Sequence, residues 1–110
     1  MTYDSNVTII NPSSQNSELV CPRCASTYLH HGAVTNYDRS EDEETVTKAV
    51  VNGKDVSITA GAPNDGNPSS RRHGLVIAFS CEACGDGLEL TVAQHKGMTL
   101  MGWRYESTTL

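Results

Sequence analysis

The sequence predicts a mostly β protein with little or no helix: a small antiparallel sheet in the form of a β-meander with two hairpins. β-Branched and aromatic residues gather in short runs, separated by clusters of Gly, Pro, Asn and Ser. No run repeats apolar residues at the i, i+3, i+4, i+7 spacing of an amphipathic helix. All four cysteines stand in two Cys-x-x-Cys pairs. We therefore expect two tight cysteine turns in the sheet, with a long insertion between them.

The length of 110 residues fits one domain with a moderate core. Residues 1–18 are rich in Ser, Asn and Thr, which predicts a flexible N-terminal tail that docks one short strand at residues 7–10. Residues 19–106 then form the β domain. Because the apolar content is 37%, burial alone leaves little margin over chain entropy, and we expect a second source of stability.

The first half of the insertion predicts a strand and a hairpin. Residues 27–37 read as the strand, and residues 45–59 read as a hairpin around the dipeptide Asn-Gly at positions 52 and 53. A two-residue turn at this dipeptide would pair Val51 with Lys54. Pairing Val50 with Val56 gathers more apolar residues on one face, so we favour that register and a loop of three to five residues.

The second half predicts a long loop, a central strand and another hairpin. Residues 61–74 are dense in Gly, Pro, Asn and Ser and predict the loop, whereas residues 75–81 are apolar on both faces and predict the strand. The second hairpin turns at residues 95–97, where pairing Gln94 with Met98 aligns the apolar side chains that flank the turn.

Cysteine usage depends on the redox compartment. The chain has no run of 18 apolar residues, and its start lacks the basic and apolar regions of a signal peptide, so we expect a cytoplasmic protein without a membrane segment. Structural disulfides do not persist in a reducing cytosol, and four cysteines there indicate metal binding or catalysis.

The spacing of the cysteines indicates one structural zinc ion held by Cys21, Cys24, Cys81 and Cys84. Zn²⁺ binds four thiolates tetrahedrally, and two intervening residues let one tight turn present both sulfurs of a pair. Gly85 supplies a permissive backbone after the second pair, whereas Ala25 stands at the equivalent place in the first. Structural zinc contributes an apparent ~10–16 kcal/mol, which would supply the missing stability.

Three other uses of the cysteines are less favoured. An all-thiolate iron site of the rubredoxin kind is the second choice, because the same knuckles accept iron. A thioredoxin-like redox pair needs a helix after the Cys-x-x-Cys, and none is predicted here. A zinc deaminase needs a His-x-Glu sequence, which the chain lacks.

Two cysteine knuckles that open a β-meander resemble the zinc ribbons. The wider set "CPRC…YLHHGAV", "NPSSRRHG" and "QHKG", across roughly residues 20–104, is similar to small uncharacterised proteins of phages and bacterial mobile elements. The first resemblance implies a metal at the four cysteines, and the second implies no particular activity. The long insertion and Ala25 are departures from a plain ribbon.

The histidines are expected to lie outside the metal site. His30 and His31 would point to opposite faces of a strand, and four thiolates already complete the coordination of zinc. No Ser-His-Asp, P-loop or paired-carboxylate pattern occurs, so we do not expect an enzyme.

Charge separates two hypotheses for the function. A net charge of −5 disfavours nucleic-acid binding and favours a zinc-stabilised module that presents residues 38–45 and 61–74 to a protein partner. Such a module could be a phage or mobile-element accessory factor that acts on a host protein. The alternative is a nucleic-acid-binding ribbon, with stacking from Trp103 and Tyr105. Its basic patch, which is also the tentative binding site for a partner, comprises Arg71, Arg72, His73 and Lys96. A simpler interpretation pairs the arginines with the acidic residues 41–44.

Overall fold

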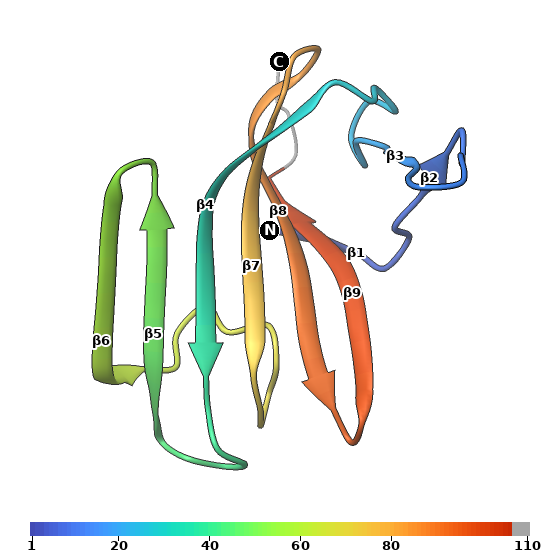
Figure 1. Ribbon diagram of the computed structural model, residues 1–110. Helices are drawn as coiled ribbons and strands as arrows, with labels where there is room; N and C mark the ends of the chain where they lie inside the picture. The colour runs from blue at the N-terminus through green and yellow to red at the C-terminus, as the bar shows by residue number, and fades with distance from the viewer. Residues whose placement is uncertain (107–110) are drawn as a thin grey trace.

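The computed structural model describes residues 1–106, and over this range the chain is all β (Figure 1). The strands are β1 (Thr2–Asp4), β2 (Ile9–Ile10), β3 (Glu18–Leu19), β4 (Leu29–Asp38), β5 (Thr45–Asn52), β6 (Asp55–Pro63), β7 (Gly74–Cys81), β8 (Gly85–His95) and β9 (Met98–Tyr105). The predicted fold class is confirmed. No helix in residues 1–106 is long and apolar enough to cross a membrane.

Seven strands form one antiparallel sheet in the order β1-β9-β8-β7-β4-β5-β6, and β2 and β3 pair separately. Two three-stranded meanders make up most of the sheet, because β4, β5 and β6 are consecutive neighbours, as are β7, β8 and β9. The pairing of β4 with β7 joins the two meanders. The long insertion between the cysteine pairs is therefore part of the sheet.

The first hairpin differs from the predicted register. Asn52 pairs with Asp55 across a two-residue turn, and Val51 pairs with Val56, so pairing Val50 with Val56 is wrong. Gly53, at φ 63°, fits the turn type that matches the twist of paired strands. The prediction assumed that one face of this hairpin is buried. Val56 is 65% exposed, so the turn rather than burial sets the register.

The second hairpin is likewise shifted by one residue. His95 pairs with Met98, so Gln94 lies opposite Thr99 and not opposite Met98 as predicted. The two residues of the turn, Lys96 and Gly97, both have positive φ, at 49° and 80°. Such a turn closes a tight two-residue hairpin.

Two small apolar clusters lie on opposite faces of the sheet. The first contains the buried residues Cys21, Cys81, Leu88, Leu90 and Trp103. Phe79 packs edge-on against Trp103, with their ring centroids 5.6 Å apart. The second cluster contains Tyr37, Val46, Ala62 and Val76. Because neither cluster is large, burial alone supplies a modest share of the stability.

The N-terminal segment contacts the sheet at two places. β1 pairs with β9, and Val7 and Leu19 pack against the first cluster. The strand that docks on the main sheet is therefore β1 and not the predicted residues 7–10, of which Ile9 and Ile10 pair with β3 instead. The flexibility of residues 1–18 stays a prediction.

The connection between β6 and β7 spans residues 64–73, shorter at both ends than the predicted loop. Its backbone is tied to the sheet, since the Ser69 hydroxyl donates to Gln94 O at 2.9 Å and the Tyr37 hydroxyl donates to Asp65 O at 3.1 Å. Through Asp65 this connection contacts Tyr37 of the second cluster.

Candidate metal centre

The first knuckle follows β3 and contains Cys21 and Cys24. The Ala25 N–H donates to Cys21 O at 2.9 Å, and the Cys21 N–H donates to Ser26 O at 2.8 Å, which folds the chain back on itself. This turn requires a left-handed backbone after the second cysteine, and Ala25 adopts it with φ 66°. An L residue with a side chain is strained in that conformation.

The second knuckle connects β7 to β8. Cys81 ends β7 and pairs with Gly85, the first residue of β8, while Cys84 lies in the turn between them. Gly85 has φ 95°, so a left-handed residue again follows the second cysteine. The two knuckles thus have the same design, with glycine in one and alanine in the other.

The four sulfur atoms form one compact group. All of them lie within 4.8 Å of one another, with Cys21 Sγ 3.6 Å from Cys84 Sγ and Cys24 Sγ 3.5 Å from Cys81 Sγ. A tetrahedral ion with Zn–S bonds of about 2.3 Å separates its ligands by about 3.8 Å. A disulfide would bring two sulfurs to about 2.05 Å. The cluster therefore fits a metal ion, and each knuckle contributes one sulfur to each close pair.

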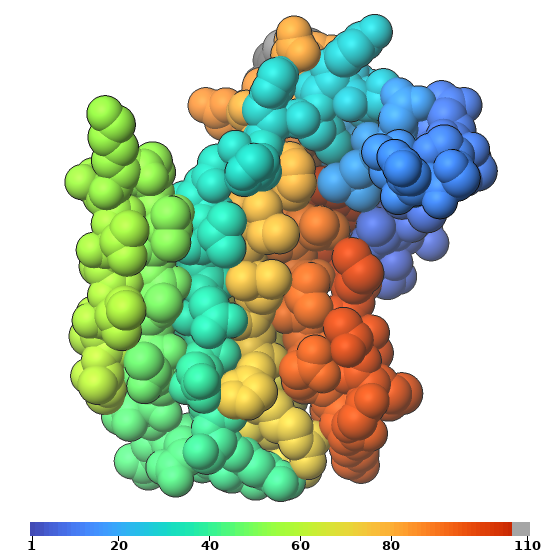
Figure 2. Space-filling model, in the orientation of Figure 1, coloured from blue at the N-terminus to red at the C-terminus, as the bar shows by residue number. Residues whose placement is uncertain are grey.

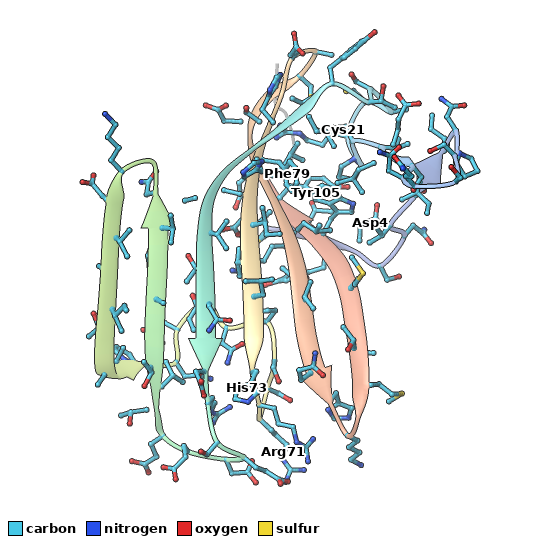
Figure 3. All side chains as sticks on the ribbon, in the orientation of Figure 1. Asp4, Cys21, Arg71, His73, Phe79 and Tyr105 are labelled. Carbon is cyan, nitrogen blue, oxygen red and sulfur yellow. The ribbon has the colours of Figure 1, made fainter. Side chains whose placement is uncertain are left out.

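The centre lies at one end of the sheet, at the edge of the first apolar cluster, as the position of Cys21 in Figure 3 shows. Cys21 and Cys81 are buried, Cys84 is half-buried and Cys24 is exposed. Four convergent thiolates leave no open coordination position for a substrate, which is the arrangement of a structural site. The exposed thiol of Cys24 gives an ion a path into the group.

The thiols of Cys81 and Cys84 have pKa values that are shifted in opposite directions. Burial alone would raise the pKa of Cys81, but the N–H groups of Cys84 and Ala83 donate to its sulfur and lower the pKa to about 6. Burial and the Cys21 thiol raise the pKa of Cys84 to about 12. The Cys81 thiol therefore loses its proton more readily than the Cys84 thiol, and binding of a cation would require that the remaining thiols release theirs.

Arg23, which the sequence analysis did not single out, ties the two knuckles together. Its guanidinium donates to Gly85 O at 3.0 Å, to Asp86 O, and to Glu106 O at 3.1 Å. The only signal in the sequence is its position between Cys21 and Cys24. A basic residue inside a knuckle can reach the carbonyl groups of the opposite one.

The histidines near the centre are not part of it. In residues 1–106 the only group of side chains close enough to hold a metal is the four cysteines. His30 Nε2 lies 2.9 Å from a Glu82 carboxylate oxygen on the surface instead.

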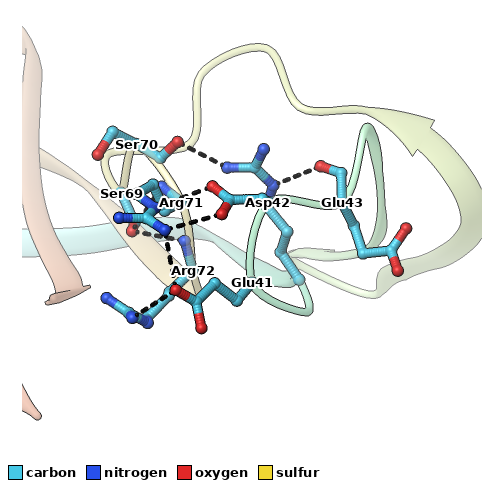
Figure 4. A network of polar contacts seen from close by, with 8 residues as sticks. Glu41, Asp42, Glu43, Ser69, Ser70, Arg71 and Arg72 are labelled. Carbon is cyan, nitrogen blue, oxygen red and sulfur yellow. Dashed lines mark hydrogen bonds and ion pairs between the residues drawn. The ribbon is translucent and has the colours of Figure 1, made fainter. Parts of the chain in front are cut away.

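The predicted basic patch lies at the opposite end of the sheet, as the labels of Arg71 and His73 in Figure 3 show. Arg71 donates to both carboxylate oxygens of Asp42 at 2.9 and 2.8 Å. Glu41 accepts from Arg71 and Arg72, each at 2.9 Å (Figure 4). The structure thus brings the arginines onto the acidic residues, which is the simpler of the two interpretations.

The rest of the patch supports the same connection. His73 Nδ1 accepts a hydrogen bond from the Arg39 N–H at 2.9 Å. The Arg39 guanidinium donates to Glu43 O at 2.7 Å and to Ser70 O at 2.8 Å. Lys96 is exposed at the tip of the second hairpin. Residues 39–43 and 69–73 therefore form one cross-linked surface, which we call the arginine network.

No family model, curated protein or solved structure matches this chain. The resemblance to zinc ribbons consists of the four-cysteine cluster itself, which is a candidate metal-binding centre.

Proposed function

We propose that the chain is a small binding module, held together by one structural zinc ion and presenting an ordered surface to a protein partner. The observation that carries this proposal is the group of four sulfurs, all within 4.8 Å, with no open position for chemistry. Cys21, Cys24, Cys81 and Cys84 would hold the ion. A closed centre of this kind supports folding rather than catalysis.

Zinc is the proposed metal because Zn²⁺ accepts four thiolates in structural sites and has no redox chemistry. Iron in a rubredoxin-like centre is the alternative, since thiolate ligands suit both ions. In either case the ion would join the chain just after β3 to the connection between β7 and β8. It would thereby close the segment that contains β4, β5, β6 and β7.

The arginine network supports the presentation of a surface. Residues 64–73 would be a loose loop by composition, yet Arg71 and Arg72 hold them to Glu41 and Asp42. The carboxylates of Glu43 and Glu44 remain exposed beside this network. A preordered acidic surface loses little entropy on binding, and it complements a basic protein surface.

Nucleic-acid binding is less favoured by the same contacts. Phosphate binding needs free guanidinium groups, and both arginines are occupied by carboxylates. The resemblance to small proteins of phages and mobile elements makes a host protein the expected kind of partner.

Metal analysis and partner capture test the proposal together. Native mass spectrometry of freshly purified, reduced protein should show one zinc per chain, whereas iron would support the rubredoxin-like alternative and a metal-free protein would contradict both. Capture from host lysate should then be compared with the E43K/E44K variant, which reverses exposed charge while leaving the contacts of Arg71 and Arg72 intact. Equal capture by the two proteins would remove the acidic surface from the proposal.

A further inference from the structure

β6 leaves one edge of the main sheet open. It is the outermost strand in Figure 1 and pairs only with β5. Over the part of the chain that the structure describes, no backbone hydrogen bond outside the strand ladders reaches residues 55–60. An edge strand carries a row of N–H and C=O groups that can pair with a further strand.

The hairpin turn decides which backbone groups face outward. Because Gly53 and Lys54 form a two-residue turn, Asn52 and Asp55 are the hydrogen-bonded pair that closes it. Hydrogen-bonded pairs alternate along an antiparallel ladder, so Ser57 bonds to β5 and the backbones of Val56 and Ile58 face outward.

The regular part of this edge is short and symmetric. The register shifts beyond Thr59, and Gly61 has φ 70°, so the regular ladder covers residues 55–59. Ser57 is the centre of this stretch. A five-residue strand that pairs antiparallel with all of residues 55–59 must place its central residue opposite Ser57.

The side chains of this stretch lack the usual protection of an edge. Val56 and Ile58 lie on one face and are 65% and 72% exposed, and Ser57 and Thr59 lie on the other face. Natural edge strands are guarded by charges, prolines or bulges. In β6 these features lie at the ends, at Lys54 and Asp55, at the register shift beyond Thr59 and at Pro63, and they leave residues 56–58 open between them. Figure 2 shows the β6 side chains standing free at the side of the molecule.

We propose that β6 pairs antiparallel with β6 of a second copy of this chain, around a two-fold axis at Ser57. Val56 then lies opposite Ile58 of the other copy, and the two residues exchange both backbone hydrogen bonds. Thr59 lies opposite Asp55, and Ser57 lies opposite Ser57. Apolar residues meet apolar residues on one face, and no two like charges are opposed.

Two copies carry complementary charges near the ends of the paired strands, although each copy has a net charge of −5. In this arrangement Lys54 extends along β6 of the other copy toward Pro63, which pairs with Thr45 beside the acidic residues 41–44. Lys54 lies opposite residue 60 of the other copy, and residue 60 is three residues, or about 10 Å along the strand, from Pro63. Each copy thus directs its Lys54 toward the acidic run of the other, and the two acidic runs lie at opposite ends of the joined sheet.

The interface involves one strand from each copy, so we expect a weak dimer whose population depends on concentration. It lies on β6, away from the cysteines, and it does not depend on the proposed function.

Sedimentation equilibrium of the metal-loaded, reduced chain tests the proposal across micromolar to millimolar concentrations. The average mass should rise from 11.9 kDa toward twice that value. The S57K variant places two ammonium groups opposite each other at the axis and should raise the dissociation constant about tenfold. The S57E variant should also dimerise more weakly, because two carboxylates meet at the axis. An equimolar mixture of S57K and S57E should recover the dimer.

T59K is the control, because it adds the same charge two residues away on the same face, where it lies opposite Lys48 of its own β5 as well as Asp55 of the other copy. Its Tm is measured beside its mass, so that a local effect of Lys48 is separated from an effect on the dimer. In the proposed register its lysine meets Asp55 of the other copy, so the dimer should be retained or strengthened. A wild-type mass of 11.9 kDa at every concentration would overturn the proposal. Equal weakening by S57K and T59K, or unchanged association of S57K, would overturn it as well.

Discussion

Two residues that differ by one methyl group occupy equivalent places in the two knuckles. Ala25 and Gly85 both follow the second cysteine of their pair and both have a left-handed backbone, with φ of 66° and 95°. A left-handed conformation costs an L residue with a side chain roughly 1–2 kcal/mol, and glycine avoids that strain. The first knuckle is therefore stabilised less than the second by its own sequence.

This asymmetry predicts opposite effects of two substitutions. A25G should raise the free energy of unfolding by about 0.5–1 kcal/mol, because relief of strain exceeds the extra chain entropy of glycine. G85A should lower it by about 1–2 kcal/mol. No atom lies within 4 Å of a Cβ built at Gly85, so the loss would be a backbone effect and not a steric clash.

Denaturant unfolding of the metal-loaded variants measures both changes. G53A is a useful control, since Gly53 also has positive φ and open space but lies in a hairpin turn far from the sulfurs. It should be destabilised without any change in metal affinity. If A25G is less stable than the wild type, the strain assigned to Ala25 is absent.

The assignment of ligands predicts a second contrast between single residues. C81S should lose metal and lower the free energy of unfolding by more than about 3 kcal/mol, equivalent to more than about 10 °C in Tm for a domain of this size. H30A should change Tm by at most about 2 °C, because His30 is exposed and its contact is with Glu82 on the surface. Thermal melts with metal quantification test both, and similar losses in the two variants would contradict the ligand set.

At the scale of the elements, the sequence predicted the kinds of structure well and their registers poorly. Strands at residues 27–37 and 75–81 correspond to β4 and β7, and the cysteines lie in turns as expected. The predicted registers of both hairpins differ from the structure by one residue, because they follow the grouping of apolar side chains. In β5 and β6 the exposed faces give burial little influence, and the positive φ of Gly53 decides the alignment.

Long-range contacts were the least predictable feature of the elements. Two interpretations of Arg71 and Arg72 are consistent with the sequence. The arginines either pair with the acidic residues 41–44 or form a free basic patch. The pairing depends on β4 and β7 being neighbours, which brings both connections to one end of the sheet. Arg23 is unpredicted for the same reason, since its carbonyl partners lie at the start of β8, in Gly85 and Asp86, and after β9, in Glu106.

The arginine network predicts an effect on a loop more than on global stability. R71A should lower Tm by only about 1–3 °C, because an exposed ion pair contributes little. The same variant should make residues 64–73 markedly more sensitive to proteolysis, since Arg71 holds this connection to Asp42. D42A should have a smaller effect, because Arg71 keeps its contact with Glu41, and the double variant should be no worse than R71A alone.

Ionic strength supplies the control for this prediction. Added salt should accelerate cleavage of the wild type toward the rate of R71A, because salt screens exposed ion pairs. K54A removes a cation from another exposed turn and should leave cleavage unchanged. Unchanged protease resistance of R71A would show that the hydrogen bonds donated by the Ser69 hydroxyl and the Arg39 guanidinium hold the connection without Arg71.

At the scale of the whole molecule, the small core and the four thiols form one system. The first cluster includes Cys21 and Cys81 among its buried residues, so the metal centre is continuous with the apolar packing around Leu88 and Trp103. Removing the ion would leave several thiols in close contact at the edge of that cluster. Folding and metal binding are therefore expected to be coupled.

The coupling gives a defined dependence on pH. In the metal-free protein the pKa of Cys81 is lowered to about 6, so its contribution to stability is present above the ordinary thiol value of 9.0 and is lost as pH falls toward 6. The pKa of Cys84 is raised to about 12, so its contribution is present below 9.0 and is lost as pH rises toward 12. The bound ion needs all four thiolates, and acidification should therefore release it by protonating them.

Removal of the metal is the prediction that tests the whole molecule. An apparent binding free energy of ~10–16 kcal/mol equals or exceeds the net stability of a typical domain, so a strong chelator at neutral pH should unfold most of the sheet. The amide proton shifts should lose their dispersion and the β signal in circular dichroism should fall, and both should return when zinc is added back. Mild acid should produce the same loss without a chelator, together with release of the ion. A metal-free chain that keeps its native amide spectrum would show that the apolar clusters alone hold the sheet, and the four cysteines would then be a site added to a stable fold.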